Sequence, residues 1–414
     1  MGAGQRGADV YAKLIATEKT GFTVAGVVEP DDRRRAAVRR AHDLPPAHAF
    51  ADIDAFLAAP RFCRTVFVCT PDHAHYRICK AVARAGYDVL LEKPVAHNIA
   101  ETLALLEIEH ATETRIVVAH VLRYTPFFTK VRELVQGGAL GRVLHVKLTE
   151  CIGQWHFAHS YVRGNWRRTD TSGPIILTKS SHDLDILAWL LDAEATWVSS
   201  EGSLVYFNEA HAPVGATERC VACPHRETCL YSATRFYLND RHEWPYNVIA
   251  PIDDTPAARA HALETGPYGR CVYHNDNDVC DTEITWIRFA SGATANFSLQ
   301  AHTAENTRRI TIWCEGGAIS GDLRENALTV TRLGPGIDST AERLDLGAPV
   351  DSHGGGDIRM LHALHDYFAH GIQTDQISSL DRSVASHLLA FLAEESRRSG
   401  GVRIPMVRAR PTSS

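Results

Sequence analysis

The chain opens on Gly2-Ala3-Gly4-Gln5-Arg6-Gly7, and this stretch decides the fold of its first part. The spacing is G-x-G-x-x-G, and a stretch of helical character follows at residues 8–19. In such a turn the first glycine permits the tight bend, the second lets the backbone approach a pyrophosphate, and the third lets helix and strand pack closely. The helix N-terminus attracts the phosphate charge. The pattern predicts a dinucleotide site that includes Gly2, Gly4, Gln5, Arg6 and Gly7.

The segment after the turn supports the same prediction. Residues 22–28 (FTVAGVV) are typical of a buried parallel strand, and Glu29 follows it, 22 residues after Gly7. An acid at this place accepts hydrogen bonds from the ribose hydroxyls of the adenosine. Glu29 would repel a 2′-phosphate, so we expect NAD rather than NADP. The basic run at residues 33–35 weakens this expectation, although such a run is most often the solvated face of a helix.

Two further strand–helix units follow. Residues 64–69 (RTVFVC) are typical of a strand that ends in Thr70-Pro71-Asp72-His73. After a helix, residues 88–91 are typical of the next strand, which ends in Glu92-Lys93-Pro94. Strands that alternate with helices form a parallel, doubly wound sheet whose ligands lie at the carboxyl ends of the strands. We therefore expect an α/β dinucleotide-binding domain over residues 1–142.

The first strand of that sheet has no counterpart in the sequence. A G-x-G-x-x-G turn follows a central strand, yet only Met1 precedes Gly2. We expect that roughly 5–8 residues, about one strand length, are missing before Met1, unless another segment fills the position. The sheet should then be weakened and the protein poorly soluble, and restoring the upstream residues should raise its thermal stability.

Length and composition define the class of protein. The chain has 414 residues, enough for two domains, with 45% hydrophobic and 22% charged residues. The net charge of −6 argues against nucleic-acid binding, which usually needs a basic surface. No apolar run approaches the ~18 residues that span a bilayer, and no signal peptide is visible, so we expect no membrane partner and a cytoplasmic location.

The rest of the chain, residues 143–414, predicts a second domain of α+β type. Its expected strands alternate polar and apolar residues, and its expected helices show helical periodicity. The strands are expected at 143–149, 282–289, 293–302, 309–314 and 328–333, and the helices at 182–191, 358–370 and 382–397. An insertion is expected at about residues 208–275.

Taken together, the motifs GAGQRG, VVEP, VCTPDHAHY and LLEKPVAHN resemble those of the Gfo/Idh/MocA oxidoreductases. Further matches are VLRYTPFF (121–128), SHDLDILAWLLD (181–192) and SHGGGDIRML (352–361). The resemblance implies an N-terminal Rossmann domain, followed by a domain with a large open, mostly antiparallel sheet. That sheet often forms the subunit interface in the family, which implies a homodimer or homotetramer.

The resemblance also implies the roles of individual residues in hydride transfer from a sugar-like alcohol. An alcohol that gives up a hydride must also lose its proton, so a base is needed. The implied catalytic pair is Lys93 and His182. The implied cofactor residues, besides the glycine turn, are Glu29, Thr70, Pro71, His75, Glu92, Lys93 and Arg123. Our own further candidates are Lys179 and Tyr161 for catalysis, and Tyr124, Trp155, His159, Arg163, Trp166 and Asp183 for substrate binding.

The chain departs from the family at one catalytic position. Many sugar dehydrogenases of the family have an aspartate four residues before the histidine, and here that residue is Thr178, followed by Lys179. On a helical turn Lys179 and His182 would share a face. Such a pair would favour an anionic intermediate or substrate, unless Lys179 is a solvated surface residue.

The segment WHFAHSYVRGNWRR, residues 155–168, combines aromatic rings with three arginines. Aromatic rings stack on sugar faces, and arginine binds carboxylate, sulfonate or phosphate with two parallel hydrogen bonds. We weigh substrate binding by Arg163 evenly against ordinary salt bridges in a loop, and we favour salt bridges for Arg167 and Arg168.

The insertion contains a cysteine pattern. Cys220, Cys223 and Cys229 have the spacing C-x2-C-x5-C, and Cys271 could be a fourth ligand. In a reducing compartment this spacing favours a structural metal over disulfides. Zinc is the first expectation, an iron–sulfur cluster also fits the ligands, and free thiols are the alternative.

Three functions remain open at this point. The first is an NAD-dependent oxidoreductase acting on a sugar hydroxyl. The second is a glycosidase that uses NAD as a recycled cofactor: it would oxidise C3, eliminate the glycosidic group, add water and reduce the ketone again, for instance on a sulfoquinovoside or a uronide. The third is a dinucleotide sensor without catalysis, which would have no need of Lys93 and His182.

Overall fold

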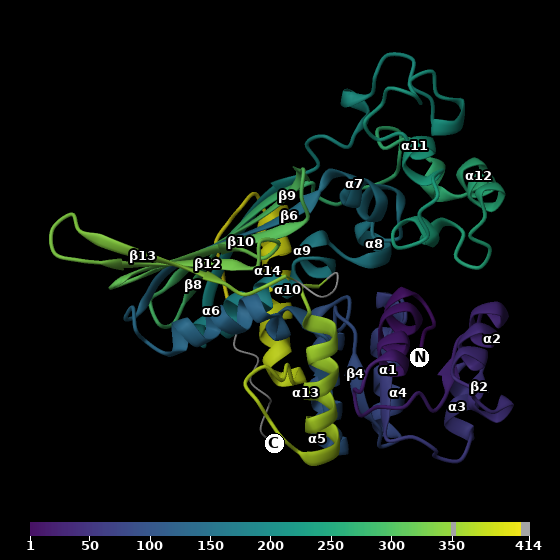
Figure 1. Cartoon of the computed structure of the whole chain (residues 1–414), viewed down its shortest axis with the longest axis horizontal. Coiled ribbons are helices and arrows are strands. Elements are labelled where there is room, and N and C mark those ends of the chain that lie inside the picture. Colours follow the sequence, from purple (N-terminus) through teal and green to yellow (C-terminus); the bar gives the residue numbers. More distant parts are fainter. Residues whose placement is uncertain (349–352, 407–414) are drawn as a thin grey trace.

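The computed structural model describes residues 1–348 and 353–406. It divides into a small parallel sheet with helices, a large sheet, and an insertion that lies beyond one end of the large sheet (Figure 1). The predicted α/β fold class, with a Rossmann-type sheet followed by a large open sheet, is confirmed.

The first domain contains two separate groups of parallel strands. Strands β3 (Thr65–Val68), β4 (Asp88–Leu91) and β5 (Ile116–Val118) form one group, and β1 (Val27–Val28) pairs with β2 (Ala49–Phe50) in the other. The strands of the first group are apolar because both faces of their sheet are covered. The helices of this domain are α1 (Lys13–Thr17), α2 (Asp32–Ala41), α3 (Ile53–Ala58), α4 (His75–Arg84) and α5 (Ile99–Thr112).

No strand of the described chain lies between β1 and β3. Instead the backbone of Met1–Ala3 bridges them: Gly2 N donates to Val28 O at 2.9 Å, and Cys69 N donates to Met1 O at 2.8 Å. Beside this bridge is a cavity of about 150 Å³. Only Val27 and Val28 of the predicted strand 22–28 form a strand, because the preceding residues have no neighbouring strand on the β3 side.

The second domain is built on one nine-stranded sheet. Every neighbouring pair is antiparallel except β6–β9, so the predicted antiparallel character is confirmed. From one edge to the other the strands are β13 (Ser339–Asp345), β12 (Ala327–Leu333), β11 (Gly317–Asp322), β10 (Thr307–Cys314), β6 (Val143–Gly153), β9 (Thr294–Thr303), β8 (Thr282–Phe289), β7 (Ala195–Ser203) and β14 (Ile404–Pro405). Strands β7, β11, β13 and β14 were not predicted.

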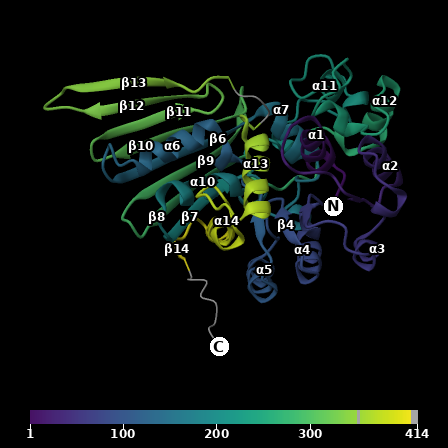
Figure 2. The same cartoon turned by 60° about the horizontal axis from the view of Figure 1, so that its bottom comes forward.

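Helices cover one face of this sheet, as Figure 2 shows. They are α6 (Pro126–Gln136), α10 (Ser181–Leu191) and α14 (Leu380–Arg398). A further helix, α13 (Gly356–His370), packs instead on the first domain, where Leu361 and Leu364 meet Leu90 and Val117. The C-terminal part of the chain therefore joins the two sheets.

The insertion consists mainly of short turns. Its longer helices are α11 (Ala233–Tyr237) and α12 (Pro256–Thr265), which share a small apolar core with Cys220 and Tyr246. It lies next to α7 (Gln154–Phe157), which continues strand β6 (Figure 1). The insertion thus stands over the segment that carries the predicted substrate aromatics.

Candidate active site

The glycine turn has the shape of a phosphate site. Gly2 has a φ of +84°, and a Cβ there would lie 2.5 Å from the carbonyl oxygen of Cys69. A Cβ on Gly7 would lie 2.0 Å from the carbonyl oxygen of Gly2. Gly4, in contrast, has nothing within 4 Å of that position. Two glycines therefore close the turn, while the third leaves the backbone open where a helix begins at Gln5.

Arg6 is held at the centre of a charged network. Its Nε donates to Glu92 Oε1 and one Nη donates to Asp357 Oδ1, both at 2.7 Å. Tyr11 OH also donates to Glu92, and His353 bonds to the second oxygen of Asp357 at 2.6 Å. Burial alone would raise the pKa of Glu92, but Arg6 and Tyr11 hold it below its usual value. The other Nη of Arg6 is buried without a hydrogen-bond partner among the described residues, so it can donate to a phosphate.

Glu29 lies directly after β1, with its carboxylate buried beside the glycine turn. Its Oε2 accepts from Ala3 N at 2.6 Å, and its Oε1 accepts from Asp31 N at 3.1 Å. Each oxygen keeps a lone pair for a ribose hydroxyl. Of the basic run, Arg35 is engaged with the carbonyl oxygen of Glu29 at 2.6 Å and with Asp32. That arginine therefore has partners other than a 2′-phosphate.

His75 connects the two loops that follow β3 and β4. One ring nitrogen bonds to Thr70 O at 2.9 Å and the other to Pro94 O at 2.6 Å. Pro71 then starts the short turn Asp72–Ala74. The hydroxyl of Thr70 is buried without a partner among the described residues, so it is available to a ligand. The turn, Arg6, Glu29 and Thr70 together fit a nicotinamide dinucleotide.

Lys93 projects from the carboxyl end of β4 towards the second domain. Its Nζ donates to the carbonyl oxygen of Thr178. Burial lowers the pKa of Lys93 to about 8. The neighbouring Lys179 acts in the same direction, whereas Asp72 and Glu92 oppose it. An amine with this pKa can accept a proton near neutral pH.

His182 lies in the first turn of α10 and is 8% exposed. Burial first, and then the charge of Lys93, lowers its pKa well below the usual value, so the ring is neutral. Its Nδ1 has no hydrogen-bond partner among the described residues. The ring of His120 lies edge-on to it with centroids 5.6 Å apart, and His387 lies behind His120. The sequence analysis did not single out His120 or His387.

Behind His182 two cations are paired with two carboxylates. Lys179 Nζ lies 3.3 Å from Glu150 Oε1, and Arg308 lies 2.6 Å from Glu150 Oε2 and 2.9 Å from Asp183 Oδ1. Burial raises the pKa of Asp183 to about 6, against the influence of Arg308. The carboxylates offset both cations, which weighs against an anionic substrate, and the expectation that the Lys179–His182 pair favours an anionic intermediate or substrate stays a prediction. Lys179 also precedes helix α10 rather than lying on it.

Aromatic side chains line the segment after β6. Trp166 Nε1 donates to Asp72 Oδ2 at 3.0 Å, which links this segment to the first domain. Tyr161 is stacked with Trp166 at 6.0 Å between centroids, and burial raises its pKa well above the usual value. Trp155 contacts Trp244 of the insertion at 5.7 Å. Rings from both parts of the chain therefore meet beside the Lys93 loop.

Two residues predicted to bind substrate face the insertion instead. His159 Nδ1 bonds to the hydroxyl of Tyr237 at 2.6 Å. Arg163 donates to the carbonyl oxygens of Arg270 at 2.8 Å and Tyr231 at 2.6 Å, and it is 2% exposed. Both side chains are buried against the insertion, and their role as substrate ligands stays a prediction. The four predicted metal ligands also belong to the insertion.

Three other predicted residues have structural partners. Arg123 forms two hydrogen bonds of 2.7 Å with Asp185, in a buried pair, and its role as a cofactor ligand stays a prediction. Tyr124 is 1% exposed and packs with Leu90 and Val117. Asp183, paired with Arg308, positions that arginine rather than presenting a free carboxylate.

The residues that the sequence analysis missed lie on different elements. Glu150 and Arg308 face each other directly across strands β6 and β10. The alternation of polar and apolar residues along these strands contained a signal for them, because each strand has a charged residue at a position that faces the protein interior. Only the pairing register brings the two together.

None of the helices in the described part of the chain is long and apolar enough to cross a membrane.

Comparison with known proteins identifies the family. Residues 1–120 match the oxidoreductase family with an NAD-binding Rossmann fold, and residues 128–222 match the GFO/IDH/MocA C-terminal domain. The chain belongs to the GFO/IDH/MocA family of oxidoreductases.

Individual relatives are distant. YteT of Bacillus subtilis, which is named as an oxidoreductase, is 24% identical over 319 residues, which cover 75% of this chain and 73% of YteT. Inositol 2-dehydrogenase of Leifsonia xyli is 31% identical over 195 residues, which cover 46% of this chain and 51% of that enzyme. The match thus spans about half the length of the inositol 2-dehydrogenases.

Solved structures share the fold over most of the chain. Levoglucosan dehydrogenase in complex with NADH and levoglucosan has a TM-score of 0.66 at 18% identity, with 93% of this chain and 90% of that chain covered. The WlbA dehydrogenase of Bordetella pertussis, in complex with NADH and UDP-GlcNAcA, has a TM-score of 0.65 at 16% identity, with 98% and 96% covered.

Proposed function

We propose that this protein oxidises a hydroxyl group of a sugar or polyol, with NAD as the hydride acceptor. One observation carries the proposal: Lys93 is half-buried, has a pKa of about 8, and lies between the glycine turn and His182. The relatives with named activities are inositol, levoglucosan and nucleotide-sugar dehydrogenases, which supports this substrate class. The acidic Glu29 supports NAD over NADP.

Four residues of the chain have separate roles in the proposed oxidation. Lys93 Nζ, held by the carbonyl oxygen of Thr178, takes the proton of the substrate hydroxyl. His182 is neutral and presents an unpartnered Nδ1, so it orients that hydroxyl by a hydrogen bond. Trp166 and Tyr161 offer ring faces to the sugar. NAD, when bound, supplies the acceptor for the hydride.

The charges around the site favour a neutral substrate. Lys179 and Arg308 have carboxylate partners in Glu150 and Asp183, so little positive charge is left for an anionic group. This weakens the case for a sulfonated or uronic sugar. Inositols and neutral hexoses are therefore the first substrates to test.

The direct test is a screen of polyols and sugars with NAD. We expect NADH to accumulate with at least one neutral substrate, and much less with phosphorylated or sulfonated analogues. A dinucleotide sensor without catalysis predicts no NADH with any of them, and it predicts that Lys93→Ala and His182→Ala behave as the natural protein.

We propose as second candidate a redox-neutral glycosidase, because Tyr161 adds another acid–base group. Its hydroxyl has no hydrogen-bond partner in the described part of the chain, and it lies near Glu150 and Asp72. In this reaction the C3 hydroxyl is oxidised, a base removes the C2 proton, the glycosidic group leaves, water adds and the ketone is reduced. A chromogenic glycoside would release its aglycone without net NADH, and solvent deuterium would enter C2. NADH accumulation without aglycone release rejects this candidate.

We propose further that two copies of the chain pair through the uncovered face of the large sheet. Ile284, Trp286 and Trp313 are 40%, 49% and 42% exposed there, on a face that no helix of the described chain covers. His145 lies between the two tryptophan rings. Light scattering should give a dimer or tetramer that Trp286→Lys dissociates, and a monomeric natural protein contradicts the pairing.

The ten cysteines are all unpaired thiols, which supports a reducing compartment such as the cytoplasm.

A further inference from the structure

Four cysteines of the insertion surround one small cavity. Cys220 and Cys271 flank a bridge between Arg219 and Arg270, in which Cys271 N donates to the carbonyl oxygen of Glu218 at 2.8 Å. The antiparallel bridge holds these two cysteines on adjacent segments although they are distant in sequence.

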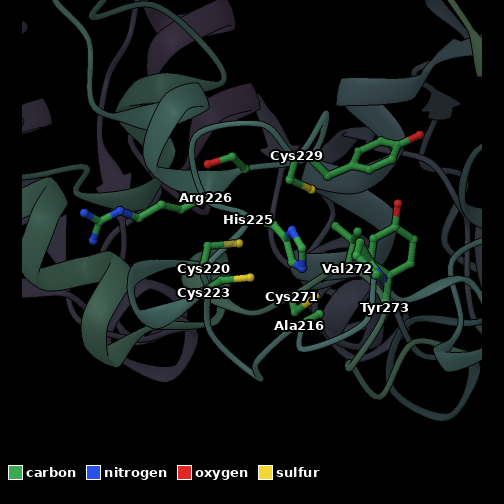
Figure 3. A pocket seen from close by; sticks show the side chains of 12 residues that line it. Ala216, Cys220, Cys223, His225, Arg226, Cys229, Cys271, Val272 and Tyr273 are labelled. Atoms are coloured by element: carbon green, nitrogen blue, oxygen red, sulfur yellow. The ribbon is translucent and has the colours of Figure 1, made fainter.

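The loop after Cys220 brings the thiols of Cys223 and Cys229 to the same cavity. Cys229 N donates to the carbonyl oxygen of His225 at 2.8 Å, which closes a turn between Cys223 and Cys229. All four thiols line a cavity of about 20 Å³ (Figure 3). His225 lies among them, but its Nε2 bonds to the carbonyl oxygen of Val214 at 2.8 Å. The four cysteine sulfurs are therefore the candidate ligand atoms of this cavity.

A buried arginine indicates that the thiols carry negative charge. The guanidinium of Arg163 lies 3.6 Å from the sulfur of Cys220, and its other partners are the backbone carbonyls of Arg270 and Tyr231 and the side chain of Tyr237. Within the described residues it has no carboxylate at salt-bridge distance, and it is 2% exposed. A buried cation without an anion costs several kcal/mol. Neutral thiols do not supply that anion, whereas thiolates do. A bound metal removes the protons of the thiols, because the thiolate is the ligand form.

We propose that Cys220, Cys223, Cys229 and Cys271 ligate a thiolate-bound metal centre, either a zinc ion or a preassembled iron–sulfur cluster. Binding forms one metal–sulfur bond per cysteine and releases one proton from each thiol to solvent, and no electron is transferred. Four thiolates around Zn²⁺, or around a cubane cluster of charge 2+, carry a net charge of −2. Arg163 offsets part of this charge.

Either metal centre requires the thiols to move. A tetrahedral zinc site with Zn–S bonds of about 2.3 Å brings its sulfurs to about 3.8 Å from one another. In the described chain, no three of these sulfurs lie mutually within 4.8 Å. A single zinc ion would therefore draw the thiols together, whereas a four-iron cluster would widen the cavity of about 20 Å³.

The metal centre would fix the insertion over the active site. It joins residues 218–229 to Cys271, and the same insertion supplies Trp244, which meets Trp155, and Tyr237, which bonds to His159. Loss of the centre should therefore loosen the aromatic wall and raise KM more than it lowers kcat. This consequence rests on the proposed dehydrogenase function, but the presence of the metal does not.

The test is elemental analysis of untagged, full-length protein purified both in air and without oxygen. We expect about one zinc ion per chain, or about four iron and four acid-labile sulfide ions with visible absorption, and the two results distinguish zinc from a cluster. Cys220→Ser and Cys271→Ser should lose the metal. Less than about 0.2 metal per chain in both preparations overturns the proposal.

Two controls keep the test independent of folding and of other ligands. Cys63→Ser makes the same substitution outside the insertion and should retain the metal. His365→Ala combined with His370→Ala removes the other group of candidate ligands in the described chain, His365, Asp366 and His370, and should also retain it. In the natural protein, a mercurial reagent that blocks thiols should release the metal without any substitution. Metal that stays bound after complete thiol blocking, or in Cys220→Ser, contradicts the assignment.

Discussion

Arg308 and Arg163 are both buried, but their charges are offset in different ways. Arg308, in the active site, lies between the carboxylates of Glu150 and Asp183. Arg163, at the insertion, has backbone carbonyls and the sulfur of Cys220 as partners. The first site is balanced by its own side chains, so its chemistry depends on the pKa of Lys93. The second is balanced only if the thiols are ionised, which is the reason to place a metal there.

We expect the largest effect from substitution of Lys93, the general base of the active site. Lys93→Ala should lower kcat/KM by about 10²–10⁴-fold, because a positioned general base contributes that much to proton transfer. The measurement is the rate of NADH formation with the best substrate from the screen. Lys13→Ala, on an exposed position of α1, is the matched control and should be unaffected. Equal rates for both variants would remove Lys93 from the mechanism.

Arg308→Met should strongly destabilise the protein. It leaves Asp183 buried without its cation and leaves Glu150 with Lys179 as its only cation, and breaking such a buried pair costs about 3–5 kcal/mol of unfolding free energy. Urea unfolding at pH 7 measures this loss. Burial raises the pKa of Asp183 to about 6, so Asp183 can regain a proton at lower pH and the deficit should shrink as the pH falls towards 5. A deficit that is small at pH 7, or that grows on acidification, would contradict the charge balance described here.

The effect of Arg163→Met on the stability of the protein should depend on the bound metal, whereas the effect of Arg308→Met should not. In the metal-loaded protein it removes a hydrogen bond to a thiolate and should cost about 1–3 kcal/mol. After removal of the metal the same substitution deletes an uncompensated buried cation, so it should cost less or stabilise. Thermal unfolding of both proteins, with and without metal, gives the comparison. The same cost in both states would show that Arg163 does not respond to the charge of the thiols.

The smallest expected effect is a shift of the pH profile. The rate of oxidation should rise with pH through about 8, as Lys93 loses its proton. Lys179→Met removes a positive charge that lowers the pKa of Lys93, so the rise should move to higher pH. The profile of kcat/KM measures this, with Lys130→Met, which is paired with Glu133 on α6, as the control. A shift to lower pH would contradict the influence assigned to Lys179.

The sequence predicted what depends on local pattern. The glycine turn, the strands that precede Thr70 and Glu92, and the hairpin of β8 and β9 each follow from spacing or alternation. Short or edge strands such as β1, β11 and β13 were misjudged or missed, because neighbouring strands rather than their own residues decide whether they form.

The site was predictable only in part for the same reason. Lys93 and His182 lie in motifs, whereas His120, Glu150 and Arg308 reach the site through tertiary packing and sheet register. For Arg163 we weighed substrate binding evenly against ordinary salt bridges, because its segment is aromatic and basic. Its true direction depends on Cys220 and Tyr231, which lie 57 and 68 residues further along the chain.

The most direct test of the central claim is the formation of NADH from NAD with a panel of inositols and neutral sugars. We predict NADH and the corresponding ketone in equal amounts with at least one of them. If the protein binds NAD, as shown by calorimetry, but forms neither product with any member of the panel, the proposed oxidation of a sugar or polyol hydroxyl is contradicted.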